Sequence, residues 1–433
     1  MQLKLPKGHS KLLNAWAFYD WANSVYALVI SSSIFPLYYG ALFRIKGVEK
    51  VIIFGKLVSS EALISYVTAF GFIIIAFISP LLSGIADYLG NKKFFLKLFC
   101  YLGSISCMGL YFFSLDHIYL GLFTYLLALI GFWGSLVFYN SYLPDIAHKN
   151  QQDKISAKGF SLGYIGSVVL LLICLAMVMT AADEQKLKMM QYSFLLVGIW
   201  WLGFSQYTYY YLPDVKNNNK LHKNIIFNGF KELQKVGQKI KNNIPLKNYL
   251  TAFFVYSMAV QTIMIIAAYF GEKEVAWGSA SNRTTGLIVS ILVIQLVAVL
   301  GAYLTSKLVT VIGNIKVLIL LNFAWILICI YAYFVITPQQ FYIAASFVGL
   351  VMGGIQSLSR STYSKFIPAA TIDTTSFFSF YDVAEKIGIV IGMLTYGIVA
   401  DVTGKIQNAI LILALFFAIG LVLLFRVREN FEK

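Results

Sequence analysis

The sequence predicts an all-α membrane protein in which twelve transmembrane helices form two six-helix bundles. Of the 433 residues, 59% are hydrophobic and only 12% are charged, whereas a soluble domain carries about 25% charged residues. Apolar stretches long enough to cross a bilayer, about 20 residues each, recur along the whole chain. One long polar stretch, residues 213–246, divides them into two groups of six.

The predicted spans, in chain order, are 13–39, 61–87, 94–115, 118–143, 159–182, 190–212, 247–271, 284–308, 315–337, 340–366, 376–400 and 406–426. They define an N-terminal bundle over residues 1–212, a cytoplasmic linker over 213–246 and a C-terminal bundle over 247–433. The first dozen residues are polar, and no small-residue cleavage site follows the first span. We therefore expect a retained anchor helix instead of a cleaved signal peptide.

Basic residues gather in alternate loops, and this pattern orients the chain. With both termini in the cytoplasm, the inside segments hold 24 of the 34 Lys and Arg residues and the outside loops hold 9. The split follows the positive-inside rule and explains the net charge of +15 without a nucleic-acid partner. The cysteines lie in apolar spans without ligand-like spacing, which predicts neither a disulfide nor a metal site; they are Cys100, Cys107, Cys174 and Cys329.

The first span carries a carboxylate inside its apolar run. Asp20, Asn23, Ala27 and Ser31 recur at helical spacing and therefore share one face. An ionisable group costs roughly 2.5–3.5 kcal/mol in the middle of a bilayer and usually faces a cavity or a partner. We expect Asp20 to face the protein interior, where it serves a cavity or coupling; the alternative is that it only pins the helix to its neighbours.

The linker contains an amphipathic segment. Apolar residues at helical spacing lie on one side of it, with lysines around the rest; the apolar residues are Ile226, Phe230, Leu233 and Ile240, and the lysines are Lys231, Lys235, Lys239 and Lys241. This pattern predicts a helix lying on the inner membrane surface. A regulatory or partner-binding helix is the alternative.

The turn after the second span, Ser83–Lys93, resembles the signature of the major facilitator superfamily. Gly90 permits a tight turn, and Lys92 and Lys93 are expected to anchor at the anionic inner leaflet. Asp87 is expected at the N-terminus of a helix in the other half, where the helix dipole favours an anion by roughly 0.3–1 kcal/mol. An ordinary basic turn is the alternative interpretation.

Further segments resemble the vacuole-effluxer-like branch of that superfamily, in family order along nearly the whole chain. They are Tyr19–Ser24 with Phe35–Pro36, Phe138–Pro144, Ser156–Phe160, Gly163–Gly166, Gly354–Ser361 with Ile367–Pro368, and Phe377–Asp382. The seventh span departs, because Met258–Ala259 stand where the family tends to carry Asp-Gly. The resemblance implies the major facilitator fold and, from eukaryotic members associated with amino-acid export from the vacuole, an amino-acid-like substrate.

Two later spans also carry charges. Gln356, Arg360 and Tyr363 form a polar ridge on span ten, where the fork of Arg360 suits a carboxylate of the substrate or of the protein; an anchor at the inner interface is an equal alternative. On span eleven, Asp382 and Lys386 are spaced to pair at i, i+4, with Glu385 beside them. One carboxylate is left over and is a candidate for titration; a static salt-bridge cluster is the alternative.

The sequence therefore predicts a secondary transporter of small polar solutes that works by alternating access and is coupled to protons. The family fold implies a cavity lined by spans 1, 4, 7 and 10, which nominates as substrate-binding residues Asp20, Asn23, Tyr26, Asn140, Gln261, Gln356 and Arg360. All four histidines lie outside the spans, so the candidate proton carriers are Asp20, Asp382 and Glu385. The residues nominated for a conformational latch are Asp87, Gly90, Lys92, Lys93 and Lys386.

Neither a phosphate-binding loop nor a catalytic triad or metal ligand set is recognisable, so we expect neither an enzyme nor an ATP-driven pump, and no cofactor. The expected partners are the lipid bilayer, a small-molecule solute and protons, and we expect a monomer in the cell (inner) membrane. Two alternatives remain open. One is an exporter of the same fold for a drug or a sugar, and the other is a non-transporting membrane sensor or scaffold.

Overall fold

The computed structural model describes residues 5–48, 50–214, 225–368 and 371–429. Helices of the first half, in chain order, are α1 Ser10–Val25, the π-helix η1 Tyr26–Ser31, α2 Ile34–Ile45, α3 Ser60–Leu89, α4 Lys92–Gly109, the 3-10 turn η2 Leu110–Phe112, α5 Ile118–Asn140, α6 Leu143–Ile146, α7 Lys149–Thr180, the 3-10 turn η3 Asp183–Gln185 and α8 Lys186–Tyr211. A small antiparallel hairpin, β1 Lys50–Ile53 and β2 Lys56–Ser59, precedes α3.

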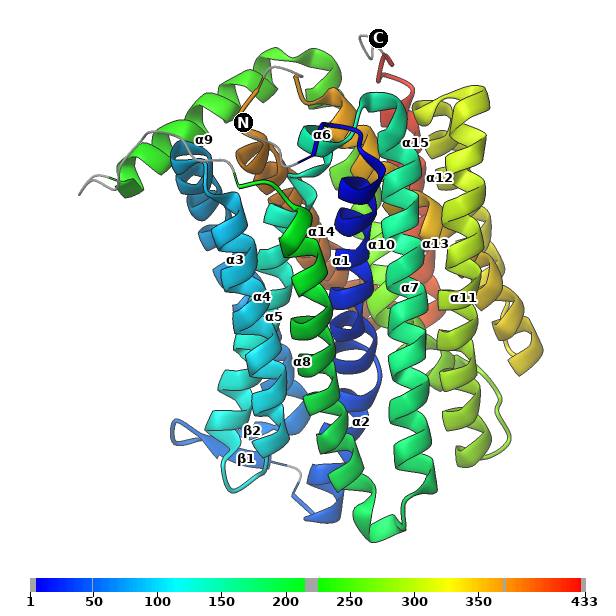
Figure 1. Cartoon of the computed structure of the whole chain (residues 1–433). Coiled ribbons are helices and arrows are strands. Elements are labelled where there is room, and N and C mark those ends of the chain that lie inside the picture. Colours follow the sequence, from blue (N-terminus) through cyan, green and yellow to red (C-terminus); the bar gives the residue numbers. More distant parts are fainter. Residues whose placement is uncertain (1–4, 49, 215–224, 369–370, 430–433) are drawn as a thin grey trace.

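The second half follows the linker helix α9 Ile225–Asn242. It contains α10 Ile244–Glu274, α11 Ala280–Ile312, α12 Asn314–Tyr333, α13 Pro338–Phe366, α14 Thr374–Thr403 and α15 Ile406–Leu424. The two halves meet where α7 packs on α11 and α13, and where α3 packs on α14. The described ends of the chain lie at the same end of the molecule as α6 and α9, and the β-hairpin lies at the opposite end (Figure 1).

The predicted all-α membrane fold of two six-helix bundles is confirmed. Eleven helical stretches among the described residues are long and apolar enough to cross a membrane. The one predicted span not among these eleven is the sixth, 190–212, which corresponds to α8, a helix of 26 residues that packs on α1 and α4. It is less hydrophobic because Lys186, Lys188 and Gln191 lie in its first turns and several tyrosines in its last.

The first span is longer and less regular than predicted, running from Ser10 to Ile45 through a π-helical segment and a break at Ser32–Ser33. The break has a local cause, since Pro36 has no N–H and its ring clashes with the carbonyl four residues earlier. The Ser32 hydroxyl donates to the carbonyl of Ala27 over 2.9 Å across the irregular turn. The fifth span also begins earlier than predicted, because α7 starts at Lys149 with a capping box between His148 and Gln151.

The amphipathic linker segment is a helix, but its predicted apolar side is divided. Gly229 contacts Ile85 of α3, and a side chain at Gly84 would collide with the carbonyl of Gly229. Val236 and Ile240 are buried, whereas Ile226 and Phe230 stay exposed. The whole apolar side was expected on the membrane surface; instead α9 crosses the ends of α3 and α14 and packs on α3 (Figure 1), because two glycines allow close backbone approach.

The contact between α11 and α13 offers a test of packing. A side chain at Gly301 would collide with the backbone carbonyl of Leu350, and overpacking of this kind costs about 1–3 kcal/mol. We expect Gly301→Ala to lower the apparent melting temperature of the purified protein. The matched control is Gly203→Ala on α8, where nothing lies within 4 Å of the added carbon; equal melting temperatures for the two variants would contradict the close packing.

Candidate functional site

A buried ion pair joins the two halves at Asp20 of α1 and Arg360 of α13. The guanidinium Nη2 lies 3.1 Å from Asp20 Oδ2, and the hydroxyl of Tyr139 on α5 donates to the same oxygen over 2.8 Å. Asp20 is 5% exposed and Arg360 3%. A side chain at Gly159 of α7 would collide with this carboxylate, so glycine allows α7 to approach the pair.

Arg360 also donates hydrogen bonds to Ser156 and Asn140 of the first half. Its Nε donates to Ser156 Oγ over 2.9 Å, and Nη2 donates to the carbonyl of Ser156 over 3.0 Å. Nη1 donates to Asn140 Oδ1 over 3.3 Å, and the guanidinium carbon lies 4.2 Å from the ring centre of Phe160. Of the two interpretations of Arg360, the structure favours the one in which it holds a carboxylate, here a carboxylate of the protein.

A second charged cluster lies on α14. Lys386 pairs with Asp382, as its i, i+4 spacing predicts, and its Nζ lies 3.3 Å from Glu385 Oε2. Gln261 of α10 donates to Glu385 Oε1 over 2.6 Å. The ammonium of Lys386 also lies 3.9 Å from the ring centre of Trp133 on α5, so this cluster too reaches across to the first half. Two carboxylates face one ammonium, which leaves a surplus negative charge.

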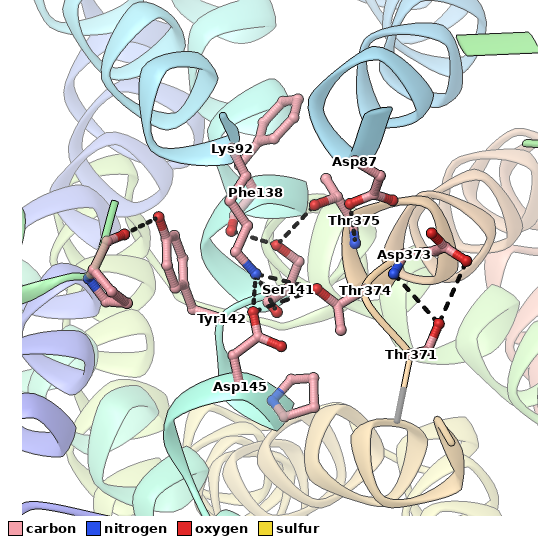
Figure 2. Close-up of polar contacts among 12 residues, drawn as sticks. Asp87, Lys92, Phe138, Ser141, Tyr142, Asp145, Thr371, Asp373, Thr374 and Thr375 are labelled. Atoms are coloured by element: carbon pink, nitrogen blue, oxygen red, sulfur yellow. Dashed lines mark hydrogen bonds and ion pairs between the residues drawn. The ribbon is translucent and has the colours of Figure 1, made fainter. Parts of the chain in front are cut away.

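The third group of contacts closes the end of the molecule at which α6 and α9 lie (Figure 2). Asp87, at the end of α3, accepts hydrogen bonds from the backbone N–H groups of Thr375 (3.2 Å) and Ser376 (2.6 Å) at the start of α14. This is the placement that the sequence predicts, a carboxylate at the positive end of a helix dipole in the other half. Gly90 ends α3 in the left-handed conformation, with φ of 67°.

Lys92 and Lys93, expected from the sequence to anchor at the inner leaflet, both have side chains that are buried against protein. Lys92 pairs with Asp145 and donates to the hydroxyl of Thr374 over 3.1 Å, so it also touches the second half (Figure 2). Lys93 donates to the carbonyl of Leu212 over 2.8 Å.

A further inter-half cluster joins α7 to the second half. Asp153 pairs with Lys365 of α13 and accepts a hydrogen bond of 2.8 Å from the amide of Asn314, which begins α12. Lys365 also donates to Asn314 Oδ1 over 3.0 Å. The turn before α12 contains no acidic residue of its own. Its place is taken by Asp153 of α7 and by Glu429, whose carboxylate accepts a hydrogen bond of 2.9 Å from the backbone N–H of Asn314.

The remaining nominated residues lie in three different settings. Gln356 accepts a hydrogen bond of 2.7 Å from Tyr164 of α7 and so bridges the halves next to Arg360. Asn23 is buried, and its Nδ2 has no hydrogen-bond partner among the described residues. Tyr26 stacks on Phe132 of the first bundle, with the two ring centres 4.7 Å apart.

Sequence reasoning missed several residues that complete these clusters. One is Trp16, whose ring centre lies 4.8 Å from the guanidinium carbon of Arg360; the others are Trp133, Tyr139, Asp145, Asp153, Ser156 and Phe160. Tyr139 and Ser156 lie in the very segments that carry the family resemblance, so those segments contained a usable signal. Trp133 precedes Asn140 by seven residues and shares its helix face, which would have placed it toward the second half. The sequence pattern does not indicate a role for Asp153, because an acidic residue in a predicted loop is common.

Comparison with solved structures defines the class of fold as that of major facilitator superfamily transporters. FucP in its outward conformation matches with a TM-score of 0.71 at 15% identity, over 97% of this chain and 99% of FucP. A bacterial homologue of the iron transporter ferroportin in an outward-facing state matches with a TM-score of 0.67 at 10% identity, over 96% and 98%. At these identities the likeness concerns the fold.

The chain belongs to the Atg22-like vacuole effluxer family, whose family model matches residues 9–432. It is similar to YxiO of Bacillus subtilis, described as an uncharacterized MFS-type transporter, with 33% identity over 98% of this chain and 96% of YxiO. It is also similar to autophagy-related protein 22 of Yarrowia lipolytica, with 25% identity over 64% of this chain and 50% of that protein. The protein is accordingly a membrane-embedded transporter of this superfamily and not an enzyme.

The buried pair predicts a strong thermodynamic coupling between Asp20 and Arg360. Removing one partner of a buried pair leaves an uncompensated charge and costs about 3–5 kcal/mol. We expect Asp20→Asn and Arg360→Gln each to lower the apparent melting temperature in detergent, and the double variant to recover much of the loss. Additive losses in the double variant would contradict the pairing.

The contact of Asp87 with α14 predicts that charge at this position keeps the closed end shut. We expect Asp87→Asn to weaken closure, since a charge at a helix N-terminus contributes about 0.3–1 kcal/mol and up to about 2 kcal/mol when partly buried. A reporter cysteine replacing the buried Ser141 should then react faster with N-ethylmaleimide; the four native cysteines are buried and give a low background.

The matched control for this labelling is Asp116→Asn, which removes an exposed carboxylate paired with Lys46 near the opposite end. Its labelling rate at the reporter should equal that of the parent. If Asp87→Asn labels no faster than this control, Asp87 does not hold the two halves together.

Proposed function

We propose that the protein is a proton-coupled secondary transporter of small, amino-acid-like solutes in the cell membrane. The observation that carries the proposal is the Asp20–Arg360 pair, whose two charges come from different halves. Alternating access requires the halves to separate at the end that is closed here. Separation must therefore break this pair and leave two buried charges that need new partners.

An amino acid suits this requirement chemically. Its ammonium is a partner for Asp20 and its carboxylate is a partner for the fork of Arg360. Tyr139 and Asn140 stay with the first half, so Asp20 keeps its hydroxyl donor while it exchanges its cation. A sugar or an apolar drug offers neither charge, which favours the zwitterion over those alternatives.

The surplus carboxylate on α14 supports proton coupling. Asp382 and Glu385 share one ammonium, and Glu385 is further held by Gln261. A proton on one of these acids neutralises the cluster when the halves rearrange, and Asp20 provides a second proton site once Arg360 has moved away. The termini are placed in the cytoplasm by the positive-inside rule, so the closed end corresponds to an outward-facing state.

The proposed latch is the set of contacts at the closed end. Asp87, Lys92, Lys93 and Gly90 hold α3 and α4 against α6, α8 and the start of α14, and Lys386 adds its contact with Trp133 deeper in the protein. We infer that this set opens as a unit when substrate is exchanged with the cytoplasm. The protein acts in this scheme as a monomer.

Flux measurements in proteoliposomes test the substrate class. A panel of amino acids, sugars and a hydrophobic cation, with an imposed pH gradient, should give flux of an amino acid that depends on the gradient. Flux of another class with no amino-acid signal would overturn the substrate assignment. Absence of flux for every class, together with binding of a protein partner, would favour a sensor or scaffold.

The coupling role predicts that Glu385→Gln abolishes the dependence of flux on the pH gradient while solute exchange persists, because the substitution keeps the hydrogen-bonding shape and removes the titratable group. A pH-sensitive dye inside the vesicles measures proton movement. Glu272→Gln is the control, since Glu272 lies near the end of α10 in an exposed pair with Arg283 near the start of α11. Wild-type proton movement in Glu385→Gln would exclude Glu385 as a carrier.

A further inference from the structure

A groove lies beside the linker helix α9, away from the charged clusters of the interior. It has a volume of about 400 Å³ and an apolar lining from Phe230, Leu233 and Gly237 of α9 and from Phe380 of α14. Polar groups at its rim come from Lys241 and from the amides of Gln234 and Gln238. The transport scheme uses none of these residues.

The groove continues into the apolar outer surface of α14. Four apolar residues follow Phe380 at helical spacing and share its face of α14; they are Ile387, Ile391, Leu394 and Ile398. Their side chains are between 38% and 61% exposed. In a helix that crosses a bilayer, such a stripe faces lipid tails. An acyl chain lying on this stripe would end inside the groove.

The position of the groove along the membrane normal suits a headgroup. Phe380 is six residues from the start of α14, and the α9 contact at Gly84 is five residues from the end of α3; at 1.5 Å per residue both lie within about 10 Å of the helix ends. This is the level at which acyl chains give way to phosphates.

The charge of α9 selects an anionic lipid. Its described residues carry four lysines and one acid, Glu232. Lys235 pairs with Glu232, and Lys239 pairs with Asp373 over 2.5 Å. Lys241 lines the groove and is exposed, so its ammonium is positioned to meet a phosphate.

We propose that this groove binds one anionic phospholipid, with an acyl chain along the stripe below Phe380 and the phosphate against Lys241 and the two glutamines. The bound lipid contacts the linker and the second half together. Because α9 also packs on α3 of the first half, the lipid fastens a helix that bridges both halves at the closed end.

Native mass spectrometry of the purified full chain tests the site, with phosphatidylglycerol and phosphatidylcholine of identical acyl chains as probes. We expect phosphatidylglycerol to be retained preferentially, and Lys241→Gln to lower its occupancy by about fivefold, as expected from roughly 1 kcal/mol per lysine near an anionic surface. Lys231→Gln is the control, since this lysine lies outside the groove.

Gly237→Leu distinguishes lipid binding in the groove from a general attraction of anionic lipid to the lysines, because it fills the groove without changing any charge. The added β-carbon meets only the end of the Phe380 ring, at 3.3 Å. We expect it to lose phosphatidylglycerol as Lys241→Gln does, with an unchanged elution volume. The proposal is overturned by equal retention of the two lipids, by equal losses in Lys231→Gln and Lys241→Gln, or by full retention in Gly237→Leu. Displacement of the lipid by inorganic phosphate alone would also overturn it.

Discussion

The structure depends on the burial of one guanidinium whose partners belong to the opposite half of the molecule. Arginine keeps its charge under all ordinary conditions, so Arg360 needs hydrogen-bond acceptors in every conformation that the protein visits. In the state described here, Asp20, Asn140 and Ser156 provide them. Any separation of the halves must exchange these partners for others, and this requirement links the movement of the bundles to the binding of a charged solute or a proton.

The rest of the closed end follows the same physical arrangement. A carboxylate from the first half meets either a lysine or a helix N-terminus of the second half, as at Asp153 with Lys365 and at Asp87 with α14. Each contact is modest or costly alone, since desolvation offsets much of the attraction in a buried pair. Together they form a polar interface that is stable when it is closed. When it opens, water can hydrate the separated charged groups, whereas the surfaces of an apolar interface would be exposed to water without such compensation.

Local patterns in the sequence were sufficient for features that local geometry determines. Hydropathy predicts the membrane spans, i, i+4 spacing predicts the pairing of Asp382 with Lys386, and the turn motif places Asp87 at a helix start. The partner of Arg360 lies 340 residues away, and no spacing rule encodes such a contact. The partners of Tyr26 and Lys92 are not predictable for the same reason, because burial among residues distant in sequence decides where a side chain points. The division of the apolar side of α9 depends on the Gly84–Gly229 contact, which composition does not reveal.

The central claim is that the Asp20–Arg360 pair keeps the two halves together at the closed end. Pulsed electron paramagnetic resonance measures this directly, with spin labels replacing Lys154 on α7 and Val311 at the end of α11, both exposed and on opposite halves. The account predicts one narrow, short distance in the parent protein and an added population at longer distance in Arg360→Gln. An unchanged distance distribution in that variant would contradict it.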